Sequence, residues 1–122
     1  MKISICDITP MYSNAHRGGE GVTTFYTCLS PDYPEIEESV GPDDHITWVG
    51  LVEVAPGASI KEHLHDKDEE VYIVISGTGV YSEDGTPIPI GEKDVLILRR
   101  GHGHGIRNTG LTPLVFYAVV AR

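Results

Sequence analysis

The stretch HLHDKDEEVYIVISG, residues 63 to 77, places two histidines one residue apart, follows them with acidic residues and ends in a run typical of a β-strand. Side chains alternate between the two faces of a strand, so His63 and His65 would point the same way, with Cα atoms about 6.5 to 7 Å apart. Two imidazoles over that span can hold one metal ion at nitrogen–metal distances of about 2.0 to 2.2 Å. The stretch therefore predicts either a metal site or the polar rim of an ordinary strand.

Short apolar runs rich in Val, Ile and Tyr continue on both sides of this stretch, separated by glycine and proline. No segment of helical period is long enough to cross a sheet. Strands at such short spacing predict an all-β fold, a sandwich or a barrel. The predicted strands are 21–29, 46–54, 59–65, 70–76, 77–83, 86–90, 94–99, 104–109 and 113–121.

One hairpin is marked by its residues. Asp84-Gly85 suits a type I′ turn, whose two central residues both need positive φ. The strand that follows contains Pro87 and Pro89, which have no N–H to donate to a neighbouring strand. We therefore expect residues 86–90 at the edge of a sheet.

Length and charge limit the possible functions. The chain has 122 residues, the size of one domain with one core. Nine Lys and Arg against eighteen Asp and Glu give a formal charge of −9, which repels nucleic acid and anionic lipid surfaces. The first ten residues lack the apolar core of a signal peptide, and no run is long enough to cross a bilayer. We expect a cytoplasmic protein without nucleic-acid or membrane partners.

The first 45 residues differ from the rest. Residues 30–45 are acidic and interrupted by prolines, which predicts a surface loop with at most a helical turn at 35–39. The strand at 21–29 could pair with its own chain or with a partner subunit. We interpret residues 1–45 as an N-terminal arm and acidic loop packed on a barrel of residues 46–122, one domain overall. Two cysteines, Cys6 and Cys28, are too few for a disulfide scaffold and receive no function.

Two further side chains could complete a metal site. Glu70 opens the next strand, and alternation places Tyr72 on its face, whereas Glu69 would point elsewhere. His104 begins a later strand, and a barrel brings inward residues of several strands together. Three imidazoles and one carboxylate suit one divalent ion of Fe, Mn, Ni, Cu or Zn, and an octahedral ion keeps about two positions open for ligands.

These residues resemble the two motifs of the cupin family. The first, G-x5-H-x-H-x4-E-x6-G, is matched in full by Gly57, His63, His65, Glu70 and Gly77. It is highly specific, because five positions agree at fixed spacing.

The second cupin motif, G-x5-P-x-G-x2-H-x3-N, is matched only in its latter half. Gly101, His104 and Asn108 agree, whereas Lys93 and Arg99 stand where the family has glycine and proline. These departures concern the turn and the pocket rim. They therefore weaken the inference of a similar substrate more than the inference of a similar metal site.

The resemblance covers residues 46–121 and indicates a small single-domain cupin. It implies a double-stranded β-helix, or jelly-roll barrel, with the metal held inside by three histidines and one glutamate. The segment HRGGEG, residues 16–21, is similar to the arms with which small cupins contact a neighbour. The resemblance therefore also implies a homodimer.

Other residues are candidates for contacts to a bound molecule. Tyr72 and His102 could act in proton transfer, although a buried tyrosine and a solvent-facing histidine are the more ordinary interpretations. Trp48 and Val52 share a face and could line the pocket. Arg99, with its neighbour Arg100, and Arg107 could bind an anion, although arginines in an acidic protein usually form surface ion pairs.

Three functions remain open from the sequence. The leading interpretation is a metal-dependent dioxygenase, isomerase or lyase acting on a small polar or anionic molecule in the barrel. The alternative is a non-catalytic metal-bearing module that binds or senses a small ligand. The third is a metal-free scaffold, in which hydrogen bonds would have to satisfy the clustered imidazoles and carboxylate.

Overall fold

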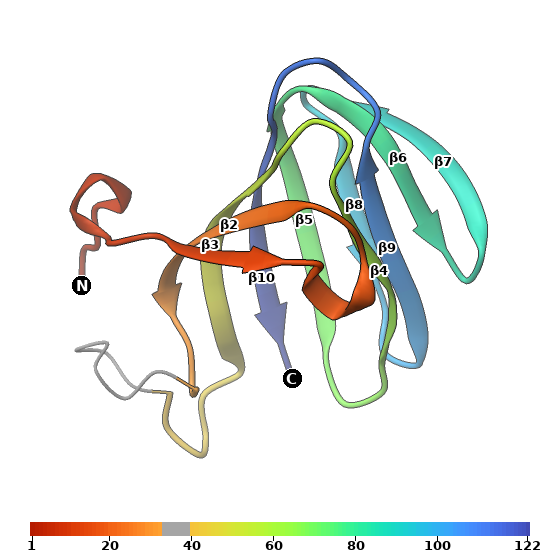
Figure 1. The fold of residues 1–122 in the computed structure, drawn as a ribbon. Helices are drawn as coiled ribbons and strands as arrows, with labels where there is room; N and C mark the ends of the chain where they lie inside the picture. Colours follow the sequence, from red (N-terminus) through yellow and green to blue (C-terminus); the bar gives the residue numbers. More distant parts are fainter. Residues whose placement is uncertain (33–39) are drawn as a thin grey trace.

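The structure is a computed structural model that describes residues 1–32 and 40–122. Within these ranges it contains ten strands and two short 3-10 helices, η1 (Ile5–Asp7) and η2 (His16–Gly18). The strands form two antiparallel sheets that curve around a common interior (Figure 1). No helix in the described ranges is long and apolar enough to span a bilayer. The all-β prediction is confirmed; the helical turn expected at 35–39 lies outside the described residues.

The larger sheet has six strands. The strand predicted at 21–29 pairs with the next strand of its own chain, with Phe25 opposite Val52. The short strand before it was not predicted, because MYSN shows no alternating apolar pattern. In spatial order the strands are β1 (Met11–Asn14), β2 (Val22–Leu29), β3 (Ile46–Val54), β10 (Leu114–Ala121), β5 (Glu69–Ser76) and β8 (Val95–Leu98).

The smaller sheet has four strands and ends in the proline-containing strand. Asp84 and Gly85 have φ values of 49° and 81°, as the predicted hairpin requires. The strand after this hairpin has one neighbour only, so its prediction as an edge strand is confirmed. In spatial order the strands are β4 (Ser59–His65), β9 (His102–Asn108), β6 (Thr78–Glu83) and β7 (Thr86–Gly91).

The core lies between the two sheets. The larger sheet contributes Val54, Leu114 and Phe116, all fully buried, and the smaller sheet contributes Tyr81 and Ile106. Removing this apolar surface from water is the main force that holds the sheets together. The side chains of Glu70 and His104 are also buried in this interior, so packing of the core fixes the strands that carry them.

The second half of strand β5 displays the predicted alternation of faces. Tyr72 and Val74 are buried, whereas Ile73 and Ile75 are exposed. Glu70 is buried on the same face as Tyr72. A carboxylate is therefore held inside the barrel, where it needs compensating partners.

Lys93 occupies the turn between β7 and β8 with a φ of 72°. This left-handed conformation favours glycine, because a Cβ atom crowds the backbone there. It is also the position at which the second cupin motif has glycine. The turn thus has a conformation that favours glycine although its residue is lysine.

Candidate metal centre

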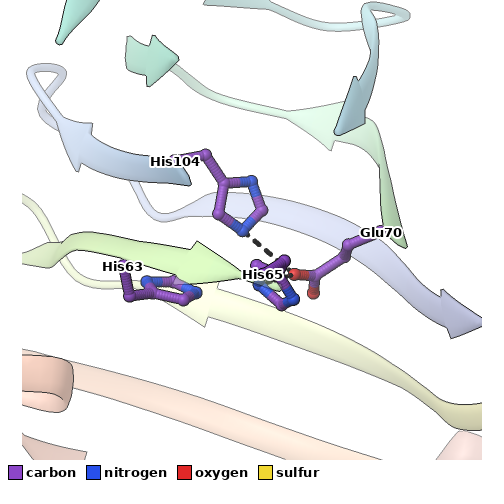
Figure 2. Close-up of side chains that lie close together, drawn as sticks. All are labelled: His63, His65, Glu70 and His104. Atoms are coloured by element: carbon purple, nitrogen blue, oxygen red, sulfur yellow. Dashed lines mark ion pairs between the residues drawn. The ribbon is translucent and has the colours of Figure 1, made fainter. Parts of the chain in front are cut away.

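Four side chains converge from three strands. His63 and His65 come from β4, His104 from the neighbouring β9, and Glu70 from β5 of the opposite sheet. One ligand atom of each lies within 4.8 Å of those of the others. Figure 2 shows the four side chains pointing toward one another. The register places His63 directly opposite His104, so the cluster depends on this pairing of strands.

Hydrogen bonds on the outer side of two histidines set which ring nitrogen faces the cluster. The Nδ1 of His63 lies 2.9 Å from the carbonyl oxygen of Lys61, which can only accept, so this nitrogen carries the proton. The Nδ1 of His65 lies 2.6 Å from Oδ1 of Asp68. In a neutral ring with Nδ1 protonated, Nε2 keeps its lone pair. Both rings therefore present a nitrogen lone pair to the interior.

The third histidine is held in the same way. The Nδ1 of His104 lies 3.0 Å from the hydroxyl of Tyr81, and its Nε2 lies 3.0 Å from Oε2 of Glu70. The Nε2 of His65 is also 3.0 Å from that oxygen, yet this buried nitrogen has no hydrogen bond to any described residue. Metal-ligating histidines are oriented by such outer partners. The donor set, its orientation and the unsatisfied nitrogen fit a divalent transition metal ion.

The charges of the cluster also suit a cation. Burial alone would raise the pKa of Glu70, but the neighbouring rings of His104 and His65 outweigh it and lower that pKa to about 2. Burial lowers the pKa of His63 to about 4, so this ring is neutral near pH 7. The neighbouring Glu70 and, after it, Asp68 raise the pKa of His65 against the effect of burial. An ionised carboxylate beside a neutral imidazole is the protonation state that metal binding needs.

A cavity of about 480 Å³ opens onto the cluster. Trp48 and Val52, predicted to share a pocket-facing side, both line it, as do Phe116 and Tyr72. The hydroxyl of Tyr72 lies 3.5 Å from Nε2 of His104. Burial raises the pKa of Tyr72 well above its ordinary value, so this residue stays a neutral phenol. It can donate a hydrogen bond to a molecule bound beside the cluster.

Three other candidate residues are not brought to this cavity. His102 is half exposed, and its Nδ1 lies 2.6 Å from Asp84 at the hairpin. Arg99 lies 3.4 Å from a carboxylate oxygen of Glu69 and is exposed. None of these side chains, nor that of Arg107, is among the described residues that line the cavity.

Arg107 faces a different part of the surface. Its guanidinium lies 3.6 Å from Glu20 and donates to the carbonyl oxygen of Gly57. The ordinary interpretation of surface ion pairing therefore describes both Arg99 and Arg107.

No pattern in the sequence indicates a role for the N-terminal residues that line the cavity. Ser13, His16 and Arg17 approach it from β1 and η2. His16 is fixed by a 3.0 Å contact between its Nδ1 and the Ser13 hydroxyl, and by its ring, 4.6 Å from that of Phe25. The one local signal was the glycine-rich segment around Arg17, which indicates a turn but not where that turn packs.

Comparison with protein families agrees with this geometry. The model of the cupin domain matches residues 50–120. This chain belongs to the cupin family. The match includes the strands that carry all four residues of the cluster, so the resemblance seen in the two motifs is confirmed.

Two comparisons, one of sequence and one of structure, match almost the whole length of this cupin. The oxalate-binding protein of Thermotoga maritima is 30% identical over 120 residues, which cover 98% of this chain and 93% of that protein. The crystal structure of a predicted oxalate decarboxylase from Thermotoga maritima is likewise 30% identical, covers 99% of this chain and 98% of that one, and has a TM-score of 0.85. The likeness thus includes the first 45 residues as well as the barrel.

A more distant structure shares the fold alone. The polyketide cyclase RemF of Streptomyces resistomycificus is 19% identical, covers 99% of this chain and 78% of its own, and has a TM-score of 0.73. Because the structurally similar proteins are cupins, the prediction of a double-stranded β-helix is confirmed. One fold hosts several chemistries, so function has to be argued from the site.

Proposed function

We propose that this cupin binds one divalent transition metal ion through His63, His65, Glu70 and His104, and that the ion holds a small anionic molecule in the cavity. The single observation that carries the proposal is the orientation of the three imidazoles by acceptors or hydroxyls behind them, with the Glu70 carboxylate at the centre. The bound ion would supply open coordination positions and Lewis acidity.

The cavity walls support a small oxygen-rich ligand. Trp48, Val52 and Phe116 provide apolar surfaces that exclude water, which strengthens electrostatic attraction inside. Tyr72 supplies a neutral hydrogen-bond donor next to the cluster. The name of the similar oxalate-binding protein points to a short carboxylate as the ligand class.

Binding without turnover is the function that this geometry supports best. Of the two residues considered for proton transfer, His102 is turned to Asp84 outside the cavity. Tyr72 remains, and its raised pKa makes it a donor of hydrogen bonds rather than a base. A metal-dependent enzyme is the second candidate, favoured by the position of the Tyr72 hydroxyl beside His104, from which a proton could reach a bound molecule.

A homodimer, a cytoplasmic location and the division at residue 45 stay predictions. Apolar side chains on the outer face of the larger sheet support the dimer. Ile73 stands opposite both Val95 and Tyr117, and all three side chains are exposed. Covering such a patch is a common reason for association between subunits.

Metal analysis of purified protein tests the proposal. We expect about one transition metal ion per chain in wild type, and little in His63→Ala or Glu70→Ala, because each removes a ligand. His102→Ala is the matched control and should keep the metal, since its side chain lies outside the cluster. Equal, negligible metal in wild type and both ligand variants would contradict the metal site.

Calorimetric titration of the metal-loaded protein with oxalate tests the ligand class. Binding that disappears in Glu70→Ala together with the metal would support the proposal. Release of carbon dioxide from oxalate, followed over the same preparations, would favour the enzyme over the binding protein.

A further inference from the structure

The cavity needs a positive charge if it is to hold an anion away from the metal. Its described lining residues include three carboxylates, those of Asp32, Asp68 and Glu70. Among the same described lining residues, Arg17 is the one lysine or arginine. A small dianion whose one end reaches the metal cluster would therefore meet a single guanidinium at its other end.

The backbone around Arg17 is held in an unusual conformation. Arg17 has a φ of 56° and Ala15 a φ of 55°, both in the left-handed region, which L-residues other than Asn and Asp rarely occupy. The turn is closed by hydrogen bonds from Ala15 N–H to Gly21 O and from Gly18 N–H to Ala15 O. Residues in such conformations gather at binding sites, where the surrounding structure maintains them.

The segment of residues 15–21, here called the arm turn, is fixed directly on the strand that carries two of the candidate ligands. Glu20 and Ser59 exchange backbone hydrogen bonds of 2.8 and 3.3 Å. A Cβ atom at Gly19 would lie 2.1 Å from the carbonyl oxygen of Ser59, so the two backbones touch here. Figure 1 shows this turn against β4. The position of Arg17 relative to the cluster is thus set by backbone contacts.

Arg17 differs from Arg99 and Arg107 in its charged contacts. Arg99 and Arg107 each face a carboxylate, whereas no ion pair of Arg17 exists among the described residues. A guanidinium without a carboxylate partner in this part of the chain is available to an anion.

We propose that Arg17 is the residue that binds the distal carboxylate of a small dicarboxylate in the cavity, by paired N–H···O hydrogen bonds from its guanidinium. The fork of N–H groups on arginine matches a carboxylate in this way. This inference rests on the proposed function, because it assigns the ligand's second anchor. It also gives the arm turn a binding role in addition to a structural one.

Oxalate titration of manganese-loaded protein tests the inference. Arg17→Asn removes the charge but suits the left-handed backbone, and Arg17→Lys keeps the charge without the planar fork. We expect the dissociation constant for oxalate to rise about tenfold or more in Arg17→Asn, the range for loss of a charge-assisted hydrogen bond. The rise in Arg17→Lys should be smaller. Arg100→Asn, the matched control at an exposed position outside the cavity, should bind as wild type does.

Manganese content provides the readout that separates a lost contact from a damaged site. Removing a nearby cation leaves metal binding unchanged or tighter, so all three variants should take up as much manganese as wild type. Unchanged oxalate affinity in Arg17→Asn, or an equal loss in Arg100→Asn, would overturn the inference while the proposed function stands. Failure of wild type to bind any of the divalent ions of Mn, Fe, Ni, Cu or Zn would overturn the proposed function. Oxalate binding that persists without metal and is lost in Arg17→Asn would still support the assignment of Arg17 as the residue that binds the anion.

Discussion

Two walls of the cavity differ in how far the sequence alone predicts their residues. The wall of β4, β5 and β9 carries the His63, His65, Glu70 and His104 cluster on strands with clear patterns, at spacings that match known motifs. The arm turn has no motif, and its residues reach the cavity through close packing against β4. The comparison teaches that a cluster of candidate metal ligands can be predicted from spacing, whereas a charge supplied by a loop depends on where that loop packs.

The two walls also differ in charge. The cluster wall offers an ionised carboxylate, that of Glu70, and the neutral imidazole of His63, which attract a cation. The arm turn offers a guanidinium, which attracts an anion. If the walls are independent, a change in one should leave the function of the other intact.

Separating the arm turn from β4 should give the largest effect. Gly19→Ala puts a Cβ atom 2.1 Å from the Ser59 carbonyl oxygen, a backbone atom that cannot move aside cheaply. We expect the free energy of unfolding in denaturant to fall by about 3 kcal/mol, the upper end for overpacking. Gly91→Ala is the control, because its nearest neighbours are 3.9 Å away.

Gly19→Ala also tests whether the two walls bind their ligands independently. Metal content should remain as in wild type, because Gly19 touches no residue of the cluster, whereas oxalate binding should weaken. Loss of the metal from folded Gly19→Ala would show that the arm turn also shapes the cluster, and the distinction between the walls would fail.

Removing an outer partner of the cluster should give an intermediate effect. Tyr81→Phe leaves the buried Nδ1 of His104 without its hydroxyl partner. We expect metal affinity, measured by competition with a chelator, to fall about 10- to 100-fold. Tyr117→Phe removes a hydroxyl from an exposed position and should have no effect. An unchanged affinity in Tyr81→Phe would mean that packing alone orients His104.

Relieving backbone strain, at one position in the arm turn and one in the barrel, should give the smallest effect on stability. Ala15 in the arm turn and Lys93 in the barrel both have positive φ. A left-handed L-residue costs about 1 to 2 kcal/mol, and glycine loses about 0.5 to 1 kcal/mol in entropy on folding. Ala15→Gly and Lys93→Gly should therefore each stabilise the protein by about 0.5 to 1 kcal/mol in thermal unfolding.

A comparison with Lys93→Ala separates strain from side-chain effects, because alanine keeps the Cβ atom and should not stabilise. Stabilisation at Lys93 without stabilisation at Ala15 would indicate that the arm turn is held less firmly than the barrel turn.

Much of the barrel could be predicted because its signals are local. Alternation in β5 placed Glu70, Tyr72 and Val74 on one face, and the prolines of β7 placed that strand at an edge. The strand β1 could not be predicted, because its four residues have little apolar pattern and it exists through pairing with β2. Short strands of this kind are defined by their neighbours.

The arginines show where prediction from sequence ended. Arg99 and Arg107 are candidates for an anion because they give one face of an acidic protein a local positive charge, but their side chains face Glu69 and Glu20. Arg17 lies in a segment without a recognisable pattern, yet it lines the cavity. Nothing in the spacing of a long, flexible side chain tells which surface it will reach.

The sequence by itself determined the all-β fold, the cupin family and the identity of the four candidate metal ligands, because strand alternation and motif spacing act over short distances along the chain. Only the tertiary structure decided that Tyr81, Asp68 and the Lys61 carbonyl orient the histidines, and that the arm turn brings Arg17 to the cavity. The Tyr81 contact and the arm turn join distant segments through the pairing of strands and the packing of backbones. The Lys61 and Asp68 contacts are local, but they depend on the directions of side chains, which spacing in the sequence does not specify.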